Sequence, residues 1–353
     1  MDSTYIGKYG QLRVLGTELL GKGAMYDLEQ KWDDFLKILS GTTYRREIDE
    51  FSALYRGPDL IDVVLNAHMM RIMENAMFAV PPGARSFVKA YLNKWDIENI
   101  KLILSAKVLS YPVEQTEKFL MVQHDVPAGL LAGIITRDDY KNIIAQKDIE
   151  GVVNSIVKYG YGTILLKYLD SAKRSNDISE MILALDLYYY DALLGAYKLH
   201  NNAEGNVGDF IAESIDVRNM TNMLKALLFG FDRPQQYIIK GGKISEKEIA
   251  DAVAKGADAI IERLPFKISE AIELYRREQF ISYIEVAQKR ELYRKYIQVF
   301  RRSGFSLAFI LAYMLMGELE RDELRNIWFS KYYGISSERY KAMQVATYVL
   351  GEN

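Results

Sequence analysis

The strongest constraint on the fold is a short motif that occurs three times along the chain. Aligned on its Asn, it reads Asp/Glu-x-x-Asn-(Ile/Met) in WDIENIKLIL (95–104), IDVRNMTNML (215–224) and DELRNIWFSK (322–331). Internal repetition is typical of a fold built from similar units, so we expect three related helical segments. The motif supplies the pairs Asp96 and Asn99, Asp216 and Asn219, and Glu323 and Asn326.

A second acidic position precedes each copy of the motif and itself follows Ile or Leu. These acids are Asp62, Asp186 and Glu273, and the longer separation in the third copy predicts an insertion there. Pro112 and Pro234 mark seams, because the residue before a proline is disfavoured in a helix. We therefore predict three similar helical domains in a pseudo-threefold arrangement, at residues 1–112, 113–232 and 233–353.

Apolar residues recur at the three- and four-residue spacing of helices. Clear examples are Glu180–Leu199 and Glu248–Leu264, and no convincing alternating strand pattern occurs. Thr136-x-x-Asp139 and Ser245-x-x-Glu248 are capping-box patterns, in which side chains satisfy the free N–H groups of a first helical turn. The predicted fold class is all-α.

The most apolar window, GFSLAFILAYMLMG (304–317), is shorter than the roughly 20 apolar residues of a membrane-spanning helix. We predict a buried helix there. The N-terminus, MDSTYIGKYG, has an acid at its second position and no apolar core, unlike a signal peptide. These features predict a soluble protein.

The motifs of common catalytic chemistry are missing from the sequence. The chain has no cysteine and no complete phosphate-binding glycine loop, and its histidines (His68, His124 and His200) lie far apart. An isolated histidine in such helices is more often a packing or surface residue than a metal ligand. We predict no catalytic, cofactor or metal site, although a site assembled from distant carboxylates is an open alternative.

A basic stretch from Arg276 to Arg302 falls in the predicted insertion. The simplest interpretation is a long amphipathic helix with a solvated charged face; the functional one is a docking surface for an acidic partner or lipid headgroups. A formal net charge of −2 gives no basic field for nucleic acid. The candidate docking residues are Arg290, Arg294, Lys295, Arg301 and Arg302.

The repeated acid and Asn pairs favour a structural interpretation over three active sites. An acid at a helix start accepts N–H bonds and complements the positive end of the helix dipole. An Asn one turn later lies on the same side and can bridge to a neighbour through its amide. We predict a packing device shared by the three units.

These motifs together resemble a known family. NKWDIENIKLIL, AESIDVRNMTNMLKALLFG and YMLMGELERDELRNIWFSKYYGI resemble the threefold signature of the C subunit of A/V-type ATP synthases, a family that includes the d subunit of vacuolar ATPases. YIIKGGKIS and YGQLRVLGTELLGKGAMYDL are similar to the family's third-unit and N-terminal segments. Lys240, where many relatives carry Pro, and Glu323, in place of Asp, depart from the pattern.

The resemblance implies a funnel of three helical domains and a function without chemistry of its own. It implies a central-rotor subunit on the cytoplasmic side of the membrane, peripheral to it, between the proteolipid ring and the D and F subunits of the central stalk. Such a subunit transmits torque between ion translocation and ATP synthesis or hydrolysis. The alternative is a helical scaffold or adaptor protein with no rotary role.

Overall fold

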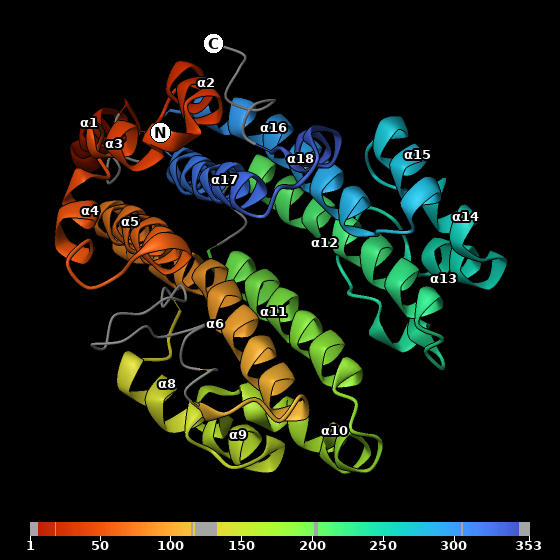
Figure 1. Ribbon diagram of the computed structural model, residues 1–353. Coiled ribbons are helices and arrows are strands. Elements are labelled where there is room, and N and C mark those ends of the chain that lie inside the picture. Colours follow the sequence, from red (N-terminus) through yellow and green to blue (C-terminus); the bar gives the residue numbers. More distant parts are fainter. Residues whose placement is uncertain are drawn as a thin grey trace. The chain divides into compact units, whose positions relative to one another are not determined.

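Helices form all the regular structure of the computed structural model within its described residues, which are 6–17, 19–113, 116, 133–200, 204–304 and 306–345. The prediction of an all-α fold is therefore confirmed (Figure 1). The helices group into two compact units, Gly83–Asn201 and a unit that combines Met1–Pro82 with Asn202–Asn353.

The unit Gly83–Asn201 is built on two long helices that lie side by side, α6 (Arg85–Val108) and α11 (Ser179–Leu199) (Figure 1). Apolar side chains such as Ile100, Leu104 and Leu185 fill the space around them and are completely buried. The shorter helices of this unit are α8 (Arg137–Ile144), α9 (Ile149–Ser155), η5 (Val157–Tyr159) and α10 (Tyr161–Ser175).

The other unit contains two more pairs of long helices. In one pair α5 (Gly57–Ala79) packs against α17 (Leu307–Tyr332), and in the other α12 (Gly205–Leu228) packs against α16 (Ser282–Arg301). Gly317 permits the close approach of α17 to α5, since a Cβ there would lie 2.9 Å from two carbons of Ile72.

Shorter helices complete this unit at both ends of the chain. Those of the N-terminal part are α1 (Ile6–Thr17), α2 (Lys22–Gln30), η2 (Trp32–Asp34), α3 (Phe35–Ser40), α4 (Arg45–Phe51) and, at the boundary, η3 (Pro82–Ala84). Those of the C-terminal part are η6 (Pro234–Tyr237), α13 (Glu246–Lys255), α14 (Ala257–Ile261), α15 (Ser269–Glu278) and α18 (Ser337–Met343).

Two helices predicted as continuous are interrupted. The segment 248–264 is divided between α13 and α14 by Gly256, whose φ of 102° is open to glycine but strained for other residues. The basic stretch predicted as one long helix is divided between α15 and α16. Gln279 ends α15 in the left-handed conformation, where its N–H donates to the carbonyl of Tyr275 at 2.7 Å.

Other local predictions are confirmed. The side chain of Thr136 accepts a hydrogen bond from the N–H of Asp139 at the start of α8, and Ser245 and Glu248 form a complete capping box on α13. From Leu307 onward the apolar window at 304–317 lies in α17, whose Leu311 and Leu315 are completely buried. No helix in the described ranges is long and apolar enough to cross a membrane.

Both predicted seams lie just beyond a long helix. α6 ends at Val108 ahead of Pro112, and α12 ends at Leu228 ahead of Pro234. The compact units themselves divide at Pro82 and Asn201. The division into repeats at 1–112, 113–232 and 233–353 stays a prediction.

Candidate functional site

Asp96 is a completely buried acid in the middle of α6 that holds the segment preceding α8. Its Oδ2 accepts the backbone N–H groups of Ile134 at 2.6 Å and Ile135 at 3.2 Å. Its carboxylate also accepts the hydroxyls of Tyr140 at 2.8 Å and Tyr161 at 3.1 Å. Burial raises the pKa of Asp96, and these four hydrogen bonds oppose the rise because they stabilise the ionised form.

Asp216 makes the corresponding contacts from α12. It accepts the backbone N–H groups of Lys243 at 2.9 Å and Ile244 at 3.0 Å, directly before the capped start of α13 at Ser245. Burial also raises the pKa of this carboxyl, against the effect of the two N–H groups. Asp96 and Asp216 therefore each bind the backbone of the segment that directly precedes a neighbouring helix.

A glycine accompanies each of these acids. A Cβ at Gly133 would overlap the carboxylate of Asp96, and one at Gly242 would overlap that of Asp216. Each glycine directly precedes the N–H groups that its acid accepts, so the absence of a side chain lets the backbone approach the carboxylate. The sequence signal is Gly-x-Ile-(Ser/Thr), ahead of both capped helices.

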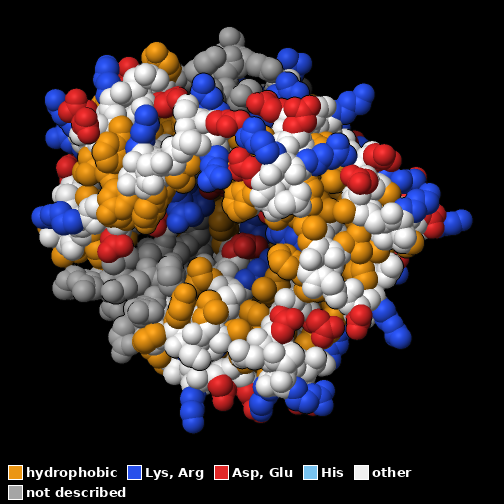
Figure 2. All heavy atoms as spheres, turned by 45° about the vertical axis from the view of Figure 1, so that its right-hand side comes forward, with side chains coloured by type: hydrophobic (Ala, Val, Ile, Leu, Met, Phe, Trp, Pro, Cys, Tyr) orange, Lys and Arg blue, Asp and Glu red, His pale blue; other side chains and the backbone are white. Residues whose placement is uncertain are grey.

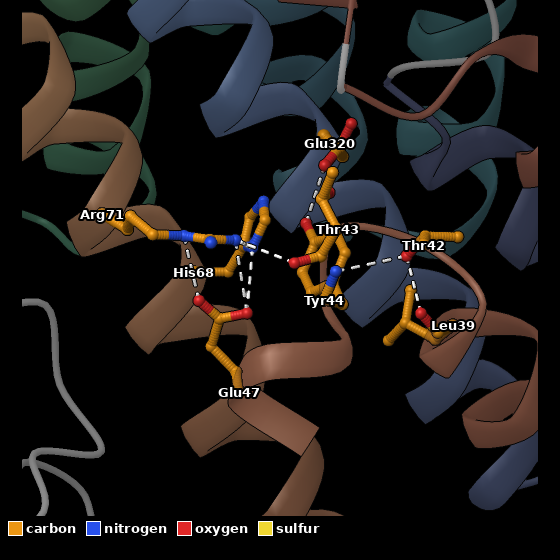
Figure 3. Close-up of polar contacts among 8 residues, drawn as sticks. All are labelled: Leu39, Thr42, Thr43, Tyr44, Glu47, His68, Arg71 and Glu320. Atoms are coloured by element: carbon orange, nitrogen blue, oxygen red, sulfur yellow. Dashed lines mark hydrogen bonds and ion pairs between the residues drawn. The ribbon is translucent and has the colours of Figure 1, made fainter. Parts of the chain in front are cut away.

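Glu320 on α17 plays the same part for the N-terminal region, although it is not among the residues predicted from the sequence. It is completely buried, accepts the backbone N–H of Leu20 just ahead of α2, and accepts the hydroxyl of Tyr44 at 2.8 Å (Figure 3). Burial raises its pKa to about 7, although Tyr44 and Leu20 stabilise the ionised form. We call Asp96, Asp216 and Glu320 the anchoring carboxylates.

Polar residues surround Tyr44 in the same region (Figure 3). Its ring stacks on His68 with centroids 3.7 Å apart, and His68 Nδ1 lies 3.3 Å from Glu47. Arg71 reaches Glu47 at 3.0 Å and donates to the carbonyl of Thr43 at 2.8 Å. His68 is thus a buried packing residue, as predicted; His200 is near the carbonyl of Gly83, and His124 lies outside the described residues.

Glu323, the predicted third acid, is one turn beyond Glu320 and binds a different segment. It is completely buried, accepts the backbone N–H of Val345 at 2.8 Å, and lies 3.4 Å from the hydroxyl of Tyr340. Val345 follows α18, whereas the anchoring carboxylates bind residues that precede a helix. Alignment of the third motif on its Asn therefore selects Glu323. The acid whose contacts match those of Asp96 and Asp216 is Glu320, one turn earlier on α17.

The expectation that these acids begin their own helices is wrong. Asp96, Asp216 and Glu323 lie well inside α6, α12 and α17. Interior positions of a helix have no free N–H groups to cap, because each N–H already bonds to the carbonyl four residues earlier. The carboxylates accept N–H groups of other segments instead.

The three asparagines of the motif differ in what they bind. Asn219 exchanges two hydrogen bonds of 2.8 Å with the backbone N–H and carbonyl of Ile239, and Asn99 donates to the Tyr140 hydroxyl at 3.3 Å. Asn326 accepts from Ser330 at 3.3 Å, but its Nδ2 has no hydrogen-bond partner among the described residues. Only Asn99 and Asn219 join separate segments through these contacts.

Two of the three upstream acids link paired long helices. Asp186 on α11 meets Lys101 on α6 at 2.8 Å, and Asp62 on α5 meets Arg325 on α17 at 2.8 Å. In the sequence, Lys101 follows Asp96 by five residues, and Arg325 follows Glu320 by five residues. This equal spacing supports the alignment of Glu320 with Asp96. Glu273 is exposed on α15, and among the described residues it has no ion pair that links two long helices.

Several predicted docking residues are engaged within their own unit. Lys295 reaches Glu213 at 2.6 Å, Arg294 reaches Glu291 at 2.6 Å, and Arg290 lies 3.6 Å from Glu291. The side chains of Arg301 and Arg302 are exposed at the end of α16. On the face drawn in Figure 2, basic and acidic side chains are interspersed with apolar ones.

The hydrogen bonds of the anchoring carboxylates suit them to hold helices together. Within the parts of the chain that the structure describes, no group of three or more His, Cys, Asp or Glu side chains could hold a metal ion. Residues 9–343 match the model of the family described as ATP synthase (C/AC39) subunit. The chain belongs to this family.

Relatives in the family are similar over nearly their whole length. The C subunit of the A-type ATP synthase from Thermoplasma acidophilum is 35% identical over 348 residues, covering 96% of this chain and 97% of the relative. The C subunit from Thermoplasma volcanium is 32% identical with the same coverage, and that from Archaeoglobus fulgidus is 30% identical over 90% of this chain and 89% of its own. The sequence resemblance is thus confirmed.

Proposed function

We propose that this chain is a non-catalytic central-rotor subunit of an A-type rotary ATPase or ATP synthase. Its role is a socket that couples the D and F subunits of the central stalk to the membrane proteolipid ring and transmits torque between them. The observation that carries the proposal is the similarity, over 96% of the chain, to proteins named as the C subunit of an A-type ATP synthase. The family match over residues 9–343 supports the assignment to a subunit of such a complex.

The packing of the chain suits a part that transmits torque. A torque coupler must resist deformation, and close-packed helices have low compressibility. The long helices bury apolar residues along their length, as Ile100, Leu224 and Leu315 illustrate. Anchoring carboxylates on three long helices add buried hydrogen bonds to the segments beside them, which stiffens each bundle.

The arrangement that we propose is a pseudo-threefold funnel of three helical units at 1–112, 113–232 and 233–353. Its support is the threefold motif. The three pairs of long helices, α5 with α17, α6 with α11, and α12 with α16, each join helices from two of these units. In the assembled complex the chain is peripheral to the membrane, on its cytoplasmic side, and reaches the bilayer through the ring. The nine residues of the predicted repeated motif then act in architecture and not in chemistry.

A pull-down from membranes that carry the complex tests this function. Tagged chain should recover the proteolipid and the D and F subunits together, and deletion of its gene should lower ATP-driven ion pumping more than ATP hydrolysis. Recovery of neither the proteolipid nor the stalk subunits would favour the scaffold or adaptor alternative. Catalysis by the purified chain alone would overturn its non-catalytic assignment.

A further inference from the structure

His68 Nδ1 lies within hydrogen-bond distance of two groups that make opposite demands on it (Figure 3). One is the guanidinium of Arg71, at 2.8 Å, and the other is the carboxylate of Glu47, at 3.3 Å. A guanidinium has N–H donors and no acceptor, so Arg71 bonds only to an Nδ1 that carries no proton. An ionised carboxylate only accepts, so Glu47 bonds only to an Nδ1 that carries one. The two contacts therefore belong to different protonation states of His68.

The neutral ring fits the contacts of Arg71 best. The contact of Nδ1 with Arg71 is shorter than its contact with Glu47, and the same guanidinium donates to the carbonyl of Thr43 at 2.8 Å and meets Glu47 at 3.0 Å. Because Nδ1 accepts in this arrangement, the proton of the neutral imidazole is on Nε2. Arg71 on α5 thereby ties both α4 and the turn that precedes it to α5.

A second proton on the ring is incompatible with this arrangement. The N–H at Nδ1 would point at a guanidinium nitrogen 2.8 Å away, and the two positive charges would repel each other. The side chains of His68 and Glu47 are only 5% exposed, whereas that of Arg71 is 30% exposed. Arg71 is therefore the residue that can turn into water. Its departure would leave Glu47 to pair with the imidazolium and would give up the hydrogen bond to Thr43.

The elements that pack on α5 set the charge around this ring. Tyr44, in the turn before α4, stacks on His68 and donates to Glu320 of α17 at 2.8 Å. Two buried acids, Glu47 and Glu320, thus lie near a single guanidinium, that of Arg71, so the cluster accommodates one more positive charge. Other charged residues of α4, α17 and α1 are engaged or exposed elsewhere: Arg45 with Asp49, Arg321 with Asn66, Arg325 with Asp62, and Arg13 on the surface of α1.

We propose that His68 is a pH-sensitive switch that exchanges the partner of Glu47. In the neutral state Arg71 joins Glu47, His68 and the carbonyl of Thr43. In the protonated state His68 itself pairs with Glu47, and Arg71 moves into solvent. The exchange loosens the hold of α5 on the turn before α4 as the pH falls through the range of about 5 to 8 in which histidines titrate. The proposal does not depend on the rotary function, since it rests on contacts within one compact unit.

Nuclear magnetic resonance of the full chain tests the protonation states directly. The chain has three histidines, so ¹⁵N labelling of histidine gives three ring spectra, and nuclear Overhauser contacts to the stacked ring of Tyr44 identify that of His68. At about pH 8 the Nδ1 of His68 should carry no proton, and at about pH 5 both ring nitrogens should carry one.

Hydrogen exchange measures the structural consequence over the same pH range. After correction for intrinsic exchange, the amides of Arg45 and Ile48, which bond to the carbonyls of Thr42 and Tyr44, should lose at least about tenfold in protection as the pH falls. This is the effect of losing one hydrogen bond from a charged donor. The amide of Leu315, within α17 of the same unit, should keep its protection, because the change is local.

Three variants separate His68 from other titrating groups. His68→Asn cannot titrate, but its amide oxygen can accept from Arg71, so its protection at Arg45 and Ile48 should not depend on pH. His200→Asn is the matched change at another histidine and should behave as the parent chain does. Glu320→Gln should retain the fall in protection, although the pKa of Glu320 is raised to about 7 by burial.

If His68→Asn loses helicity by circular dichroism, Glu47→Gln replaces it. This variant should move the titration of His68 at least about one pH unit lower, because it removes the negative charge that faces the ring. A proton on Nδ1 at pH 8, no titration of His68 down to pH 5, or an unmoved titration in Glu47→Gln would each overturn the proposal. An equal fall of protection in His68→Asn, or its loss in Glu320→Gln alone, would also overturn it, because the response would then belong to another group.

Discussion

Substitution of Glu320 by Gln should change how the stability of the protein depends on pH. The carboxyl is completely buried and its pKa is raised from 4.5 to about 7, chiefly by burial. The folded state therefore binds this proton more tightly than the unfolded chain does. The stability that the proton contributes is fully present below pH 4.5 and is lost as the pH rises through about 7.

The size of the effect follows from the difference between the two pKa values. At about 1.4 kcal/mol per unit, wild-type protein loses roughly 3 kcal/mol of unfolding free energy from this group across the window. The glutamine of the Glu320→Gln variant cannot ionise, so the variant lacks this loss. The free energy of unfolding of the variant minus that of the wild type should therefore rise by roughly 3 kcal/mol between acid and mildly alkaline pH. Other titrating groups cancel in this difference.

Urea denaturation of the isolated chain at a series of pH values from about 4 to 8 measures this difference. Tyr44→Phe is the matched variant, because it removes the hydroxyl that donates to Glu320 Oε1 at 2.8 Å and stabilises the ionised carboxylate. It should raise the pKa of Glu320 further and move the loss of stability to higher pH. A constant difference between wild type and Glu320→Gln at every pH would refute the assignment of the raised pKa to this buried carboxyl.

Two further predictions concern the contacts of the motif. Asn219→Ala should cost about 2–3 kcal/mol of unfolding free energy, because it leaves both backbone groups of Ile239 without their partner. Asn326→Ala should cost under about 1 kcal/mol, because its Nδ2 has no hydrogen-bond partner among the described residues. Equal costs of the two substitutions in urea denaturation would contradict this prediction. Gly242→Ala should destabilise the protein by about 1–3 kcal/mol, since the new methyl overlaps the carboxylate of Asp216, and an unchanged midpoint would show that the loop yields freely.

Much of the fold could be predicted from the sequence because its signals are local. Helical spacing and the caps at Thr136 and Ser245 depend on neighbouring residues, and α8, α11 and α13 begin close to the predicted positions. The helix breaks at Gly256 and Gln279 are harder to predict from the sequence. Gly256 tolerates either a helix or a left-handed turn, and Gln279 favours helix by propensity, so long-range packing decides both.

The site was predicted less completely. Asp96 and Asp216 were found through their motif, but the motif gives no sign that their partners are N–H groups ahead of α8 and α13. The motif does not identify Glu320, because alignment on the Asn selects Glu323, one turn away on the same helix. Its partners Leu20 and Tyr44 come from the opposite end of the chain, and no local pattern identifies such a contact.

The most direct test of the proposed coupling function measures pumping and hydrolysis together in vesicles that contain the complex with and without this chain. We predict that vesicles lacking the chain lose ATP-driven ion uptake, and that adding back the purified chain restores it together with binding of the D and F subunits to the ring. Full ion uptake in vesicles shown to lack the chain would contradict the claim that it couples the stalk to the ring.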